Sequence, residues 1–138
     1  YYKIMPNNIG YIYYPSFSST IGEGNLDWIL ADLAVCDALI IDIRDNGGGQ
    51  LTNIETFLRR FIHEPTLAGY IRHKTGPGHD QFSEPYPFYY YPAEAGRMTW
   101  HKPIALLINR SCFSAANNFA AIMKSAAPMP ADWSSNWK

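Results

Sequence analysis

Hydrophobic and polar positions along the chain alternate between the spacing of strands and the spacing of helices. Residues 9–14 are rich in β-forming side chains and predict a strand. Leucine or isoleucine at positions 26, 29, 30 and 33 recurs on one face of a helical period, which predicts an amphipathic helix with Asn25 as its candidate N-cap. Residues 38–43 form a continuous apolar run with one acid, a pattern typical of a strand buried on both faces.

The second half of the chain continues this alternation. Residues 52–55 have the pattern of a capping box and predict the start of a second helix. Residues 67–72 and 104–109 predict two further strands, with an irregular stretch at 74–101 between them, and residues 114–126 predict the last helix. Because strands alternate with helices, we expect an α/β fold with parallel strand pairing and right-handed crossovers.

The overall composition fits one globular domain over residues 1–138. The chain is 47% hydrophobic and 17% charged, with a formal net charge of -1, so its charge does not favour nucleic acid or an anionic membrane surface. No apolar run approaches the roughly 18 residues that a membrane span needs. Two cysteines, Cys36 and Cys112, are too few for a disulfide framework. No cluster of histidine, cysteine or acidic residues has metal-ligand spacing, so no metal is expected.

The first of two unusual turns covers residues 45–49, ends in three consecutive glycines and follows a predicted buried strand. In open α/β sheets ligands bind at this end of the strands. Consecutive glycines allow positive φ angles and leave N–H groups free to face an anion or a developing oxyanion. A tight turn with no ligand and a phosphate-binding loop are the alternatives, although neither the G-x-G-x-x-G nor the G-K-[ST] pattern is present.

The second turn contains Ser114, where the last helix is expected to begin. One interpretation is a helix N-cap, which is the common role of serine at such a position. The other is a nucleophile, beside the positive end of the helix dipole and with the N–H of Ala115 available to an oxyanion. Cys112 is a rival nucleophile, but a small buried hydrophobic residue is its more ordinary role. The local pattern leaves the two interpretations of Ser114 open.

A dense aromatic stretch covers residues 86–92, with the sequence YPFYYYP. Such a run commonly packs a long loop onto the core of a domain. The alternative is that these aromatic side chains line a groove that binds peptides.

The two turns together resemble the S41 family of serine peptidases, the carboxyl-terminal processing or tail-specific proteases, with the tricorn core as a relative. Residues 39–49 are similar to a strand followed by the family's D-x-R-x-N-x-G-G turn, and residues 106–117 to its strand followed by S-A-S-E at the nucleophile. Residues 9–17 resemble the strand that begins the family's catalytic domain. The resemblance extends over residues 8–124 and rests on the order and spacing of these motifs.

This resemblance implies a ClpP/crotonase-like α/β core and a serine endopeptidase that forms an acyl-enzyme on Ser114. It implies an oxyanion hole built from the N–H groups of Ala115 and Gly49, with Gly48 as the alternative glycine. Asp42 and Arg44, which match the family turn, are expected to pair and hold the glycine loop. A peptide or protein is then the substrate, no cofactor is needed, and the full protein is expected in a bacterial cell envelope, in the periplasm or outside the cell.

The general base is the part of the family pattern that this sequence matches least well. The processing proteases use a lysine on a strand after the nucleophile, and Lys138 is the candidate here, although the residues before it lack the character of that strand. The tricorn-like branch uses a histidine instead. The histidines are each expected at the surface: His63, His73, His79 and His101. Asn117 stands where the family usually has glutamate.

Two other functions fit the same fold. One is a non-catalytic relative that binds peptides, and the other is a crotonase-like acyl-CoA enzyme, which needs no serine at position 114. The chain starts at Tyr1 and looks structured at once, so we expect a piece of a longer protein that is truncated at both ends. A parallel sheet without its last strand would have an unpaired edge, which a homodimer would cover.

Overall fold

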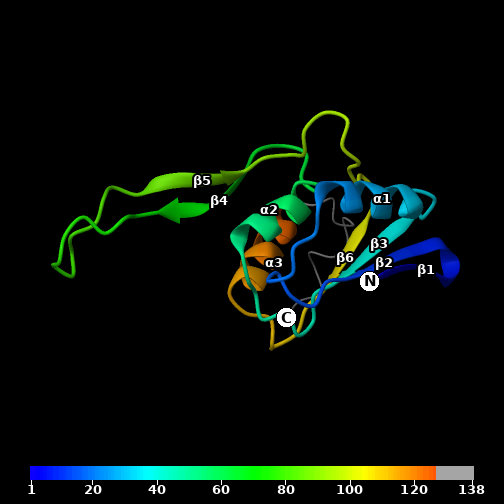
Figure 1. Ribbon diagram of the computed structural model, residues 1–138, viewed down its shortest axis with the longest axis horizontal. Coiled ribbons are helices and arrows are strands. Elements are labelled where there is room, and N and C mark those ends of the chain that lie inside the picture. Colours follow the sequence, from blue (N-terminus) through cyan, green and yellow to red (C-terminus); the bar gives the residue numbers. More distant parts are fainter. Residues whose placement is uncertain (127–138) are drawn as a thin grey trace.

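The computed structural model describes residues 1–126, which form a four-stranded sheet, three α-helices and a separate two-stranded hairpin (Figure 1). The strands of the main sheet lie in the order β1-β2-β3-β6. Their bounds are β1 Tyr2–Met5, β2 Ile9–Tyr13, β3 Ala38–Asp42 and β6 Ile104–Leu107. A short 3-10 helix, Pro6–Asn8, joins β1 to β2. Within residues 1–126, no helix has the length and apolar character needed to cross a membrane.

The centre of the main sheet is parallel. β2 pairs with β3 and β3 with β6 in parallel register, with Asp42 opposite both Tyr13 and Leu107. The expected α/β class is therefore confirmed, and the carboxyl ends of β2, β3 and β6 share one edge of the sheet. β1, which the sequence did not predict, pairs antiparallel with β2. Among the described strands β6 pairs with β3 alone, so the homodimer stays a prediction.

Three helices cover the apolar side chains of this sheet. They are α1 Glu23–Leu33, α2 Leu51–Leu58 and α3 Ala115–Ala126. The periodic leucines of α1 are buried, as predicted, and α2 and α3 pack against each other through Phe57 and Phe119, whose ring centroids are 5.5 Å apart. Phe17 lies 5.4 Å from Phe119 and links this pair to the chain that leaves β2. This aromatic contact holds α2 and α3 side by side at the edge where β3 and β6 end.

Both predicted helix caps are wrong by a few residues. α1 begins after Gly22, whose carbonyl accepts the Leu26 N–H at 3.1 Å, so Asn25 lies inside the first turn. α2 begins at Leu51, before the expected capping box, and Gln50 is its N-cap. The Gln50 N–H donates to the carbonyl of Phe17 at 3.1 Å, which keeps the chain extended up to Gln50 and lets the helix begin directly after it.

The strand predicted at residues 67–72 is confirmed as part of a hairpin, but its expected place in the main sheet and the irregular stretch expected after it are wrong. β4, Thr66–Ile71, pairs antiparallel with β5, Tyr86–Tyr90, and neither strand joins the main sheet. Residues 86–90 were expected to be irregular because of their prolines, but both strands of a two-stranded ribbon are edges, where a missing N–H is tolerated. Side chains on β5 alternate, so Tyr90 is buried and Tyr89 is exposed. Figure 1 shows the hairpin extending away from the sheet.

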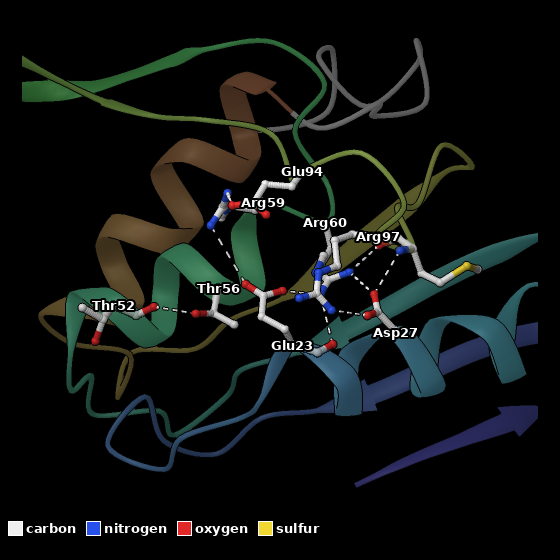
Figure 2. A network of polar contacts seen from close by, with 9 residues as sticks. Glu23, Asp27, Thr52, Thr56, Arg59, Arg60, Glu94 and Arg97 are labelled. Atoms are coloured by element: carbon white, nitrogen blue, oxygen red, sulfur yellow. Dashed lines mark hydrogen bonds and ion pairs between the residues drawn. The ribbon is translucent and has the colours of Figure 1, made fainter.

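A fully buried arginine, Arg60, ties the helices to the segment before β6 (Figure 2). Its guanidinium forms ion pairs with Glu23 and Asp27 of α1 and donates to the carbonyl of Met98 at 2.8 Å. Arg97 adds a second ion pair to Asp27 at 2.8 Å. Three segments that are distant in sequence therefore share one network of charges.

Candidate active site

The turns that follow β3 and β6 are in direct contact. Gly48 lies so close to the second turn that a β-carbon on it would be 2.7 Å from the carbonyl oxygen of Phe113. The same β-carbon would be 2.9 Å from the backbone nitrogen of Ala115 and 2.9 Å from the Ser114 β-carbon. Gly48 has a φ of 96°, a conformation that glycine adopts readily. The first turn therefore needs glycine at this position in order to approach Ser114.

Asn46 joins the two turns to the end of β2. Its side chain is fully buried, and its Nδ2 donates to the carbonyl of Tyr14 at 2.8 Å. Its Oδ1 accepts the N–H of Gly48 at 2.9 Å, and its backbone carbonyl accepts the N–H of Phe113 at 3.1 Å. No role for Asn46 could be predicted from its surroundings in the sequence. The available signal was its residue type, because asparagine commonly accepts the N–H two residues further on in a turn.

A second set of hydrogen bonds fastens the turns together. The Asp45 N–H donates to Oδ1 of Asn109 at 3.0 Å, and Asn109 Nδ2 donates to the Asp45 carboxylate at 2.9 Å. The thiol of Cys112 is buried and donates to the carbonyl of Ile43 at 3.1 Å. This burial favours the packing interpretation of Cys112 over the nucleophile interpretation, and Cys36 is buried and free as well.

Ser114 has a backbone conformation that is rare for a serine. Its φ is 53°, its side chain is exposed, and it immediately precedes α3. Its carbonyl accepts the N–H groups of Asn117 at 3.0 Å and Asn118 at 3.2 Å. A residue whose side chain caps a helix usually has an extended backbone, so this geometry does not favour the simple N-cap interpretation. Left-handed conformations cost a non-glycine residue about 1–2 kcal/mol, and such strain is concentrated at functional sites.

The predicted oxyanion donors have different surroundings. Ala115 is the first residue of α3, so its N–H has no acceptor within the helix and lies at the positive end of the helix dipole. The N–H of Gly48 already donates to Asn46, so the alternative glycine would first have to give up this bond. Gly49 is exposed and packs its backbone against Phe17. Ala115 and Gly49 remain the predicted pair.

A buried carboxylate holds the start of the first turn. Asp42 is 1% exposed and accepts hydrogen bonds from Nε of Arg44 at 2.9 Å and from the Tyr11 hydroxyl at 2.7 Å. The Arg44 guanidinium also forms an ion pair with it at 2.6 Å, which confirms the expected pairing. The hydrogen bonds from Arg44, and then that from Tyr11, lower the pKa of Asp42 to about 2.

We predict that Asp42→Asn lowers the free energy of unfolding by about 1–2 kcal/mol at pH 7. The range is kept low because Arg44 is half-exposed and water screens its charge. The folded pKa, about 2, lies below the ordinary 3.8. The stabilisation is therefore complete above pH 4 and is lost as the pH falls toward 2. Urea unfolding of both chains at pH 7, 5, 4 and 3 should show a difference that shrinks with acid. Asp80→Asn, in the exposed hairpin tip, is the control, and a pH-independent difference for Asp42→Asn would contradict the prediction.

The histidines are all exposed, as expected, and their contacts lie away from Ser114. His101 stacks on His63 with ring centroids 4.0 Å apart, and it precedes β6, whereas Ser114 follows that strand. His73 shares a hydrogen bond with the hydroxyl of Tyr86 at 2.6 Å in the hairpin. In the described part of the chain, no histidine forms a hydrogen bond with Ser114. The predicted lysine base, Lys138, lies outside the described residues.

Comparison with known proteins supports the resemblance drawn from the two turns. The family model for peptidase family S41 matches residues 8–128. No curated protein matched the sequence of this chain. The match covers both turns, β2, β3 and β6, and all three helices.

Solved structures similar to this one include several named as proteases. A candidate peptidase from Parabacteroides merdae is 42% identical, with a TM-score of 0.80 over 91% of this chain and 39% of that protein. Mature CPAF in complex with lactacystin is 17% identical, with a TM-score of 0.70 over 86% of this chain and 36% of that one. The photosystem II D1 C-terminal processing protease is 20% identical, with a TM-score of 0.59 over 85% and 28%. The last two likenesses show the fold, and the chain spans less than half of each of these proteins.

Proposed function

The chain belongs to peptidase family S41, and from this we propose that it carries the nucleophile and oxyanion hole of a serine endopeptidase. The observation that carries the proposal is the backbone of Ser114. An exposed serine with a φ of 53° lies at the start of α3 and against Gly48, where only glycine leaves room. A packing role alone gives no reason to keep this strain at an exposed residue.

In the proposed reaction, the Ser114 hydroxyl attacks the carbonyl carbon of a peptide bond while a base takes its proton. The N–H groups of Ala115 and Gly49 stabilise the tetrahedral oxyanion. Collapse of this intermediate breaks the C–N bond, the protonated base gives its proton to the leaving amine, and an acyl-enzyme remains. Water then attacks the acyl group with the help of the same base and releases the carboxylic acid. Lys138 is the predicted base.

A fluorophosphonate probe tests this proposal because an activated serine attacks its phosphorus atom, as it would attack the carbonyl carbon of a substrate. We expect intact mass and peptide mapping of the 138-residue chain to show one adduct, on Ser114. Ser114→Ala should lose the adduct completely. The matched control is Ser111→Ala, which removes an exposed hydroxyl from the same turn and should keep the adduct.

The outcomes of this experiment are distinct. An adduct on another residue would reject Ser114 as the nucleophile. A folded chain without any adduct would reject the proposal for these 138 residues, and the same test on a longer piece of the protein would then separate a truncated peptidase from a peptide-binding relative. Stabilisation of the chain by coenzyme A would favour the acyl-CoA enzyme.

A further inference from the structure

A pocket of about 200 Å³ lies between the hairpin and the first turns of α2 and α3. Its lining comes from four elements, namely the start of α2, one side of α3 and both strands of the hairpin. The lining of this hairpin pocket includes Leu51, Ala68, Ile71, Phe88, Tyr90 and Asn118.

The hairpin pocket adjoins both turns of the candidate active site. Asn118 lies one helical turn from Ser114 and donates its N–H to the Ser114 carbonyl at 3.2 Å. Leu51 begins α2, directly after the extended segment that carries Gly49. Each of the two site turns therefore leads, within a few residues, to a wall of this pocket. A peptide attacked by Ser114 would have its nearest side chains within reach of the pocket.

The chemistry of the pocket favours an apolar occupant. No residue that lines it carries a charge. The hydroxyl of Tyr90 donates to Oδ1 of Asn118 at 3.2 Å, so these two oxygen atoms are paired with each other. Leu51 is 54% exposed at the pocket, and large exposed apolar side chains beside a hollow are typical of a binding site. The volume of about 200 Å³ is large enough to admit one large side chain.

We propose that the hairpin pocket binds a leucine-like or aromatic side chain of the peptide substrate, at a residue that flanks the bond to be cleaved. This inference rests on the proposed function, because it takes a peptide at Ser114 as the ligand. It assigns the β4–β5 hairpin a role in substrate selection. Both interpretations of residues 86–92, packing on the core and lining a peptide-binding groove, are then compatible. Tyr90 is buried in the core and also lines the pocket, together with Phe88.

Peptide binding to the Ser114→Ala chain tests the pocket without cleavage. The probes are acetylated peptide amides of five residues with one variable position, Ac-Ala-Ala-X-Ala-Ala, in which X is leucine, phenylalanine, glycine or aspartate. Burial of a large apolar side chain should make the leucine and phenylalanine peptides bind about ten- to a hundredfold more tightly than the glycine peptide. Two-dimensional amide NMR titrations give both the affinity and the residues whose signals move.

Ala68→Phe should fill the pocket, because Ala68 is half-buried in its wall. We expect this variant to bind all four peptides alike. The matched control is Ala95→Phe, at an exposed position outside the pocket, which should keep the preference. If Ala68→Phe does not fold, Leu51→Ala gives the second test, since this exposed side chain can be shortened without opening the core, and it should weaken the preference.

Equal affinity for the leucine and glycine peptides would overturn the pocket proposal, as would an unchanged preference in a folded Ala68→Phe chain. These results are distinguishable from a failure of the proposed function. Fluorophosphonate labelling depends on the Ser114 hydroxyl, whereas the peptide titration is done without it. A labelled Ser114 with no side-chain preference would reject the pocket alone.

Discussion

Replacing Gly48 with alanine is expected to lower the rate at which a fluorophosphonate labels Ser114 by at least a hundredfold. The new β-carbon would lie 2.7 Å from the Phe113 carbonyl oxygen and 2.9 Å from the Ala115 nitrogen. These atoms belong to the backbone, so the two turns must move apart, and displacements of about 1 Å at a reacting group commonly cost a hundredfold in rate. The positive φ adds strain, and we expect the free energy of unfolding to fall by about 2–4 kcal/mol.

Gly47→Ala is the matched control for this prediction. Gly47 is the neighbouring residue of the same turn, but nothing lies within 4 Å of a β-carbon placed there. Its rate of labelling and its urea midpoint should stay close to those of the parent chain. The stability measurement does not depend on labelling, so it tests the contact between the turns even if Ser114 is unreactive. Parent-like values of both quantities in Gly48→Ala would show that the turns do not need this contact.

The core of the fold could be predicted because its signals are local. The leucine spacing of α1 and the continuous apolar run of β3 each reflect one element in one environment. Parallel strand pairing was predicted from the alternation of strands and helices along the chain. The hairpin could not be predicted in the same way, because β4 and β5 are stabilised by each other and the prolines of residues 86–92 resemble those of a loop.

In the candidate site, too, the local features could be predicted from the sequence and the tertiary contacts could not. The glycine run and Ser114 were visible as two turns at strand ends, and the family motif linked them. The strain at Ser114 and the buried hydrogen bonds of Asn46 depend on how the two turns meet, which is a property of the tertiary structure. Likewise, nothing local marks Arg60 as buried, since its partners on α1 are far from it in sequence. Contacts of this kind become visible only when the elements are packed.

Arg60→Ala is expected to lower the free energy of unfolding by about 3–5 kcal/mol at pH 7, the range observed when one partner of a buried ion pair is removed. The side chain is fully buried, and its loss leaves Glu23 and Asp27 in the same place with fewer partners. It also removes a donor to the Met98 carbonyl, which anchors the segment before β6. Urea unfolding measures this change. Arg97→Ala is the control, because Arg97 contacts Asp27 from the half-exposed side of the network and its removal should cost far less.

Acid should reduce the deficit of Arg60→Ala, and this dependence separates lost charge pairing from lost packing. Burial alone raises the pKa of Asp27, but hydrogen bonds from Arg97 and Arg60 outweigh burial and lower it to about 2. In the parent chain this depressed pKa contributes stability above pH 4, which is lost as the pH falls toward 2. Without Arg60 the charge of Asp27 is paired with Arg97 alone, so the pKa of Asp27 rises and protonation removes this charge at a higher pH. The difference between the two chains should therefore be largest at pH 7 and shrink below pH 4, whereas a deficit that is constant with pH would assign the effect of Arg60 to packing.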